Sequence, residues 1–131
     1  MNITGRIVKL AGAMALGTAM FVAGTVVSGS AAAETSFAED VFPIIQIRCL
    51  ECHQPGGPGY EASGLDMRTY EGVMKGTKHG PMVVPGNLAE SNLITIVEGR
   101  AQIRMPHEKK PLSKCEQLVF RHWVQQGAKD N

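Results

Sequence analysis

The sequence of 131 residues is poor in two residue types that stabilise small domains, cysteine and the aromatic residues. Its three cysteines are an odd number, which excludes a complete framework of disulfide bonds. One Trp, two Tyr and four Phe residues offer little large apolar surface for a core. Domains of this size bury a modest fraction of their surface and often depend on a metal or cofactor. We therefore expect one domain that contains such a group.

The sequence also lacks a large excess of charge of either sign. Its formal net charge is +1, from 13 Lys and Arg residues and 12 Asp and Glu residues. Arg6 and Lys9 precede Ala33 and all acidic residues follow it, so residues 34–131 carry 11 − 12 = −1. A domain without a basic excess is not typical of nucleic-acid binding. No nucleic-acid partner is expected.

Residues 1–33 have the three regions of a secretory signal peptide. Arg6 and Lys9 lie in a charged start, residues 10–27 are apolar, and Ala31-Ala32-Ala33 forms an A-x-A cleavage site. We predict cleavage after Ala33 and export of residues 34–131 to the periplasm. The alternative is a retained membrane anchor, because the apolar run is at the lower limit of a spanning length. Membrane contact is expected only in that case.

Residues 34–131 show helical periodicity and no alternating strand pattern. We therefore predict a small all-α domain with about four short helices and long loops. Ser36 and Glu39 form a capping box for a first helix that runs toward Cys49, and Pro43 should kink or restart it. Residues 54–64 contain four Gly and two Pro residues and are predicted to be a loop with no regular element.

Two short helices are predicted in the middle of the chain. Thr69 is expected to cap a helix over residues 70–75 that ends at Gly76. Asn87 is expected to cap the other helix, which turns an apolar side inward and ends at Gly99.

The last helix has the clearest signals. Ser113 and Glu116 form a second capping box, and Gly127 follows the helix as its C′ residue. A stripe at helical spacing consists of Cys115, Leu118, Val119, His122, Trp123 and Gln126. We expect Cys115 to be a buried small apolar residue rather than an interchain bridge.

The strongest chemical signal is the C-x-x-C-H motif Cys49-Leu50-Glu51-Cys52-His53, which is typical of covalent haem attachment. Two thiols separated by two residues on a tight turn can reach both vinyl groups on one edge of the porphyrin. The next residue, His53, then lies beneath the iron and can ligate it. One haem c would also supply the large apolar group that the composition lacks.

Other uses of a C-x-x-C pair fit the sequence less well. A thioredoxin-like pair requires a βαβ context, which is absent. A zinc site requires two more ligands, for which Cys115 and one of His79, His107 or His122 would have to serve. None of these residues forms a second knuckle.

Met105 is the leading candidate for the second axial ligand of the iron. Pro106 restricts the backbone of Met105 to extended conformations, in a loop just before the last helix. Most methionines serve in packing, and Met82 and His79 are the main alternative ligands. Ligation by Met would raise the reduction potential relative to two His ligands.

Taken together, these motifs resemble a class I monohaem c-type cytochrome, in particular the cytochrome c domains of planctomycete and other bacterial proteins. The matching pieces are VFPII at 41–45, CLECH at 49–53, GLDM at 64–67, VVPGN at 83–87, SNL at 91–93, RMP at 104–106 and WVQQGA at 123–128. The resemblance implies that residues 34–131 form a small cytochrome c fold around one covalent haem, with crossing N- and C-terminal helices. It also implies His53 and Met105 as axial ligands.

The function expected from these residues is one-electron transfer between redox proteins, with no enzymatic activity. Partners are expected to dock at a basic segment, residues 100–114, and the protein is expected to be a monomer. The basic residues of this segment are Arg100, Arg104, Lys109, Lys110 and Lys114. The alternatives are a haem enzyme or gas sensor with an open sixth site, or the anchored haem subunit of a larger oxidoreductase.

Overall fold

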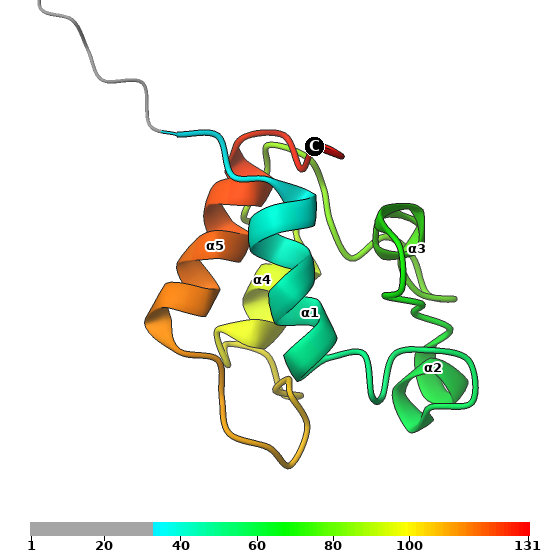
Figure 1. Ribbon diagram of the computed structural model, residues 1–131. Coiled ribbons are helices and arrows are strands. Elements are labelled where there is room, and N and C mark those ends of the chain that lie inside the picture. Colours follow the sequence, from blue (N-terminus) through cyan, green and yellow to red (C-terminus); the bar gives the residue numbers. More distant parts are fainter. Residues whose placement is uncertain (1–32) are drawn as a thin grey trace, which may run out of the picture. The chain divides into compact units, whose positions relative to one another are not determined.

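The computed structural model describes residues 33–131, which form helices joined by long loops (Figure 1). Its elements are η1 (Phe37–Val41), α1 (Phe42–Arg48), α2 (Pro58–Ser63), α3 (Tyr70–Lys75), α4 (Asn92–Val97) and α5 (Lys114–Gln125). The described residues contain no strand, only an isolated bridge between Thr77 and Gly80. The predicted all-α class is confirmed. The predicted number of about four helices is corrected to five α-helices and one π-helical turn.

The first helical stretch begins at the predicted cap and changes type before Pro43. The Ser36 hydroxyl accepts a hydrogen bond from the Glu39 amide at 3.1 Å. The carboxylate that accepts the Ser36 amide is that of Asp40, at 2.8 Å, and not that of Glu39 as predicted. A π-helical turn is wider than an α-helical one, and it places Pro43 in the first turn of α1, where a missing amide proton costs nothing.

Helix α2 corrects the prediction that residues 54–64 hold no regular element. Pro58 lies in the first turn of α2, where its fixed φ favours a helix. Gly64 ends the helix with a left-handed φ of 74°, and its amide donates to the Tyr60 carbonyl at 2.6 Å. The Gly and Pro residues therefore mark the two ends of a short helix.

Helix α3 has the predicted bounds, whereas the predicted cap of α4 is wrong. The Thr69 hydroxyl accepts the Gly72 amide at 3.1 Å, and Gly76 follows the helix. Asn87 caps a separate turn that precedes α4. Ser91 is the N-cap of α4, but its buried hydroxyl bonds to the backbone of Val84 and Asn87 instead of to the helix.

Helix α5 begins with the predicted capping box of Ser113 and Glu116. Its buried face only partly coincides with the stripe of residues predicted from the sequence. Its buried residues are Gln117, Phe120, Trp123 and Val124. Cys115, Leu118 and His122 are exposed, so the expectation that Cys115 is buried is wrong. Gln117 is buried because its side-chain amide donates to the carbonyls of Val97 and Leu112.

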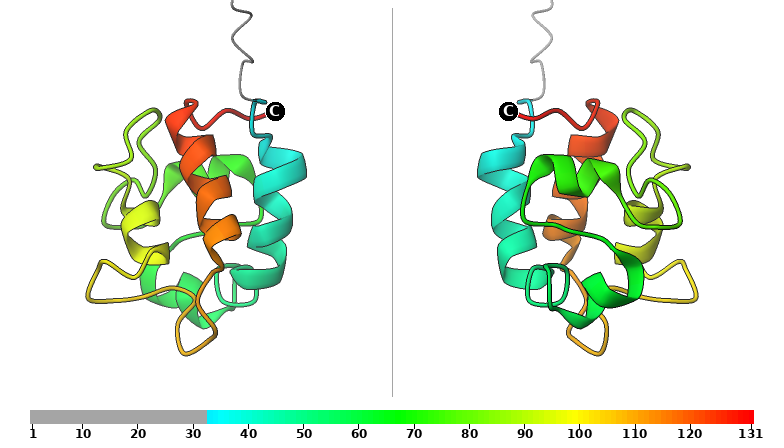
Figure 2. Two further views of the ribbon diagram at one scale, coloured as in Figure 1. Left: turned by 90° about the vertical axis from the view of Figure 1, so that its left-hand side faces the viewer. Right: turned by 90° about the vertical axis from the view of Figure 1, so that its right-hand side faces the viewer.

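The core lies where η1 and α4 pack against α5, which runs between them (Figure 2). Phe37 in η1 contacts Trp123 with ring centroids 5.5 Å apart and Tyr70 at 5.3 Å. The C-terminal residue Asn131 accepts the amides of Phe37 and Ala38, so the two ends of the described chain are joined. The crossing of the first and last helices remains a prediction, while their contact is established.

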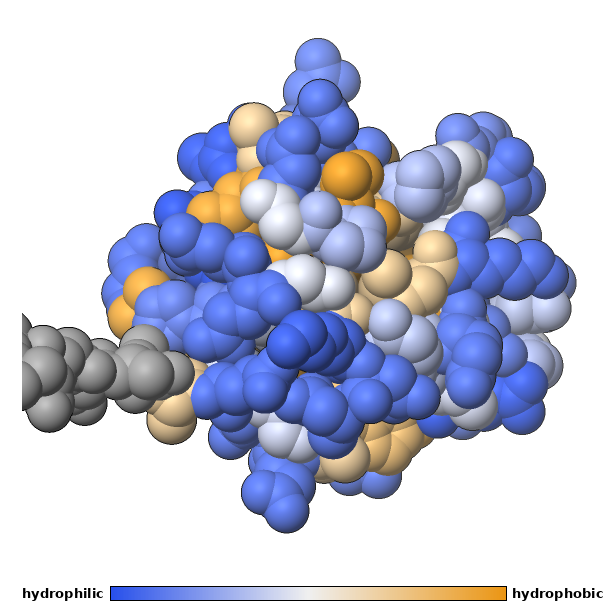
Figure 3. All heavy atoms as spheres, turned by 90° about the horizontal axis from the view of Figure 1, so that it is seen from above, coloured by the Kyte–Doolittle hydropathy of each residue, from blue (hydrophilic) through white to orange (hydrophobic). Residues whose placement is uncertain are grey.

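The surface seen from above is mostly hydrophilic, with hydrophobic patches between charged side chains (Figure 3). No helix within residues 33–131 has the length and hydrophobicity needed to cross a bilayer. The predicted signal peptide lies outside the described residues, except for Ala33.

Candidate functional site

The C-x-x-C-H motif forms a tight turn at the end of α1. Cys49 is the C-cap residue, and its amide donates to the Ile45 carbonyl at 2.9 Å. The Cys49 carbonyl accepts the amides of Cys52 at 3.1 Å and His53 at 3.0 Å. Both cysteines are free and half-buried. The backbone thus gathers two thiols and one imidazole within five residues.

The thiol chemistry differs from that of a thioredoxin-like pair. Burial raises the pKa of the Cys49 thiol to about 11, so this thiol is protonated at neutral pH. Redox-active cysteines of C-x-x-C motifs have a pKa lowered by nearby positive charge or a helix N-terminus. Cys49 instead follows the C-terminal end of a helix. Cys49 therefore lacks the lowered pKa of a nucleophilic redox cysteine.

His53 has the properties of a neutral imidazole ligand. Its side chain is 9 % exposed, and burial lowers its pKa below the ordinary value, which favours the neutral form. Its Nδ1 atom is buried and forms no hydrogen bond with any residue of the range 33–131. A neutral imidazole can give a ring nitrogen to a metal, so the residue fits haem iron.

Two glycines let the following chain fold closely over this turn. A Cβ added at Gly57 would lie 2.6 Å from the Cys52 carbonyl oxygen, and one at Gly59 would lie 2.8 Å from His53 Cε1. The Tyr60 amide donates to the Cys52 carbonyl at 2.8 Å. From the sequence, these glycines were expected only to interrupt regular structure. We call residues 54–64 the glycine cradle.

The zinc ligand set considered above is not assembled in the described part of the chain. Within residues 33–131, no three His, Cys, Asp or Glu side chains form a group that could hold a metal ion. Cys115 lies exposed on the first turn of α5.

Met105 lies on the long loop between α4 and α5, at residues 98–113. Its amide donates to the Ile96 carbonyl at 3.4 Å, which ties it to the end of α4. Met105 is half-buried, and it is not among the partly buried side chains packed against the core. Met82 is packed there, and His79 is exposed. Within residues 33–131 no hydrogen bond joins Met105 to the turn of His53, so ligation by Met105 stays a prediction.

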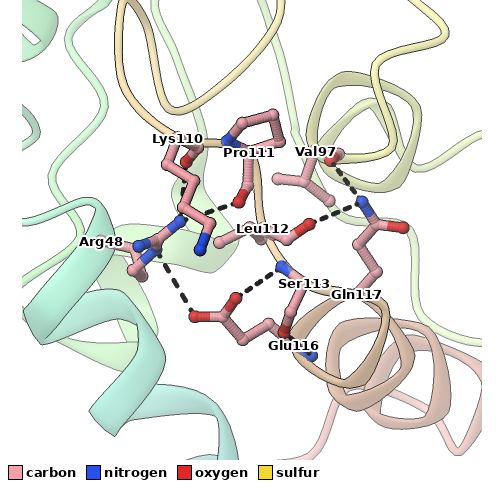
Figure 4. A network of polar contacts seen from close by, with 8 residues as sticks. All are labelled: Arg48, Val97, Lys110, Pro111, Leu112, Ser113, Glu116 and Gln117. Atoms are coloured by element: carbon pink, nitrogen blue, oxygen red, sulfur yellow. Dashed lines mark hydrogen bonds and ion pairs between the residues drawn. The ribbon is translucent and has the colours of Figure 1, made fainter.

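Arg48, which directly precedes Cys49, connects this loop to the C-x-x-C-H turn, which is proposed below as the haem-attachment turn (Figure 4). Its Nη2 atom donates to the carbonyls of Lys110 at 2.7 Å and Pro111 at 3.0 Å. Its Nε atom lies 3.5 Å from a carboxylate oxygen of Glu116. Arg48 was not predicted from the sequence as a residue of the site. The only signal was a basic residue in the last turn of the helix that precedes the motif.

The basic segment is less positive than its sequence suggests. Arg100 pairs with Glu98 at 2.7 Å, and Lys109 pairs with Glu51, which lies between the two cysteines. The other three basic residues have no carboxylate partner within residues 33–131; they are Arg104, Lys110 and Lys114. Three unpaired cations therefore remain in this segment.

Comparison with known proteins supports a haem domain. Residues 49–109 match the family model described as Planctomycete cytochrome C, which confirms the resemblance to cytochrome c domains. This range begins at Cys49 and includes Met105. No curated protein and no solved structure matches the chain. The match suggests a haem electron-transfer domain, and the two free thiols and buried imidazole fit covalently attached haem.

Proposed function

We propose that residues 34–131 form a periplasmic monohaem cytochrome c that carries single electrons between redox proteins. The observation that carries this proposal is the turn at the end of α1. It gathers the free thiols of Cys49 and Cys52 and the buried imidazole of His53. This turn begins the range that matches the cytochrome family.

Each residue has a defined task in this proposal. Cys49 and Cys52 would hold the haem through thioethers, formed by addition of their S–H groups across its vinyl groups. His53 would give a ring nitrogen to the iron, and Gly59 lets the chain pass close to its ring. When bound, haem would supply iron that alternates between ferrous and ferric states. Met105 would be the second protein ligand of the iron and would keep exogenous ligands away from it.

Absorption spectra of both redox states, combined with a potentiometric titration, test the proposal. We expect one c-type haem per chain, no carbon monoxide binding at neutral pH, and a single one-electron transition. Met105→Ala should keep the covalent haem, lose the charge-transfer band of Met-ligated ferric haem, bind carbon monoxide, and lower the reduction potential.

Met82→Ala is the matched control, because Met82 is also half-buried but packs against the core. Its spectrum should stay that of the wild type. Ready carbon monoxide binding by the wild-type protein would overturn the proposal that it is an electron carrier. It would favour an enzyme or sensor with an open sixth site.

Export with cleavage after Ala33 would create a new N-terminus beside the end of α5, where Gln126 contacts both sides of the cleavage point and donates to the Ala33 carbonyl at 3.2 Å. The Gln126 side chain accepts the Thr35 amide at 2.7 Å, and Glu34 pairs with Lys129 at 2.5 Å. These contacts would fix the new N-terminus of the mature domain to the end of α5. Sequencing the exported protein from its N-terminus should give Glu34 first, whereas a retained leader would favour the anchored subunit.

The proposed docking surface is the basic segment, through its unpaired cations Arg104, Lys110 and Lys114. Such cations attract an acidic partner over about one Debye length, roughly 10 Å at 0.1 M salt. The rate of electron exchange with an acidic redox protein should therefore fall as salt increases. Lys114→Glu should weaken this salt dependence more than Arg100→Glu, because Arg100 is already paired with Glu98. Equal effects would contradict docking at the unpaired cations.

A further inference from the structure

We infer that Arg48 is a positioning residue that holds the loop of Met105 against the haem-attachment turn. The inference rests on the proposed function, because it assigns Arg48 a role in keeping Met105 on the iron. It concerns a residue that belongs to neither the C-x-x-C-H motif nor the Met105 loop.

The contacts of Arg48 reach the end of the loop that leads into α5. Its guanidinium donates to two consecutive backbone carbonyls, those of Lys110 and Pro111. It also lies beside Glu116, whose other carboxylate oxygen accepts the Ser113 amide at 2.6 Å. Arg48 therefore holds the backbone of the loop and contacts the residue that caps the next helix (Figure 4).

The rest of the loop has few anchors of this kind. Its first part is tied to α4 by the amides of Arg100 and Met105, which donate to Thr95 and Ile96. Lys109 pairs with Glu51, but these side chains are 48 % and 78 % exposed, and such pairs contribute little. The Arg48 side chain is 22 % exposed, less than either side chain of the Lys109–Glu51 pair, and it makes two bonds to the loop backbone. Met105 thus lies between the Ile96 carbonyl on one side and the Arg48 contacts on the other.

The position of Arg48 in the chain gives these contacts a functional consequence. Its neighbour Cys49 would be bonded covalently to the porphyrin, so the Arg48 backbone would move little relative to the iron. Hydrogen bonds from this fixed point limit how far residues 110–111 can move away. Opening of the loop, which must precede loss of Met105 from the iron, would then require breaking both bonds. The guanidinium reaches both carbonyls through Nη2 while its Nε lies near Glu116, whereas a lysine has one nitrogen and cannot occupy both places.

The test measures how readily imidazole displaces the sixth ligand in the ferric holoprotein. Arg48→Gln should retain covalent haem and raise the imidazole binding constant by about tenfold or more, the effect of losing a hydrogen bond to a charged group. Trypsin should also cleave the loop faster after Lys109, whereas the Lys110–Pro111 bond resists this protease. Arg48→Lys should give an intermediate binding constant.

Two controls separate positioning from loss of charge or of stability. Arg100→Gln removes a paired arginine from the same loop, while Glu98 keeps its second partner, Arg121. Ile94→Val removes one methyl group from a fully buried side chain and lowers global stability. Both controls should leave imidazole binding near the wild-type value.

The outcomes distinguish this inference from the proposed function. If the wild-type protein lacks the Met-ligand band, ligation by Met105 fails and the inference fails with it. If the band is present and Arg48→Gln binds imidazole no better than the controls, only the role of Arg48 is overturned. If Arg48→Gln does not accumulate as holoprotein, imidazole binding by Arg48→Lys is compared with the controls instead. A binding constant no higher than theirs overturns the role of Arg48.

Discussion

The turn that carries His53 is held by its own backbone, whereas the part of the loop that follows Met105 is held by side chains from other elements. In the turn, the amides of Cys52 and His53 donate to the Cys49 carbonyl within five residues. In the loop, the first anchors after Met105 are the exposed pair of Lys109 with Glu51 and the hydrogen bonds of Arg48, which is 62 residues away from Lys110 in the sequence.

The two proposed ligands, His53 and Met105, thus differ in what determines their positions. A turn closed by local backbone bonds has a geometry that depends little on the rest of the fold. A loop held by distant side chains has the correct geometry only after the helices have packed. We therefore expect substitutions near His53 to alter the geometry of its imidazole. Substitutions near the Met105 loop should instead alter how often this loop opens.

The largest effect is expected for Gly59→Ala, which tests whether the turn is as rigid as this comparison states. The added Cβ would lie 2.8 Å from His53 Cε1 and 3.0 Å from Nδ1, so either the ring or helix α2 must move. We expect a loss of about 1–3 kcal/mol in the free energy of unfolding, measured by urea denaturation of the holoprotein. The haem spectrum and reduction potential should also change.

Gly64→Ala is the control for this substitution. Gly64 has a φ of 74°, so an alanine there is strained, but its Cβ would approach nothing closer than the Lys78 amide at 3.5 Å. The control should lower stability by about 1–2 kcal/mol without changing the spectrum. A Gly59→Ala protein with wild-type stability and spectrum would show that the turn is adaptable, and the comparison would then fail.

The same contrast explains what could be predicted from the sequence. The motif, the Ser113 capping box and the helix after Thr69 depend on residues within a few positions of each other, and all three were predicted. Helix α2 was missed because Gly57, Pro58 and Gly59 usually interrupt regular structure. The two glycines let α2 lie close to Cys52 and His53, and no local sequence pattern reveals this approach.

The face that α5 turns inward could not be determined from periodicity alone. Two overlapping sets of residues fit a helical stripe, one with Cys115 and Leu118 and one with Phe120 and Val124. The buried set includes the polar residue Gln117, because two backbone carbonyls of other segments accept its amide. These hydrogen-bond partners of Gln117 come together only when the helices have packed, and the same is true of the contacts of Arg48. Neither set could therefore be predicted from local sequence.

The smallest effect is expected for Glu116→Gln, which tests whether charge at the start of α5 contributes to holding the loop. The Ser113 amide, which donates to its carboxylate, lowers the pKa of Glu116 below 4.5, and Arg48 adds to the effect. The native state therefore binds fewer protons here than the unfolded state. The stabilisation is complete above pH 4.5 and is lost as the pH falls through the native pKa. Glutamine can still complete the capping box but carries no charge.

At pH 7 we expect Glu116→Gln to lower the free energy of unfolding by roughly 0.2–1 kcal/mol, because both side chains of the Arg48 pair are partly exposed. The difference from the wild type, measured by urea denaturation, should shrink as the pH is lowered below 4.5. Glu90→Gln is the control, since Glu90 is exposed and forms no ion pair within residues 33–131. A difference that stayed constant down to acid pH would mean that the shape of the side chain matters here, not its charge. The hold on the loop would then come from Arg48 and the backbone carbonyls alone.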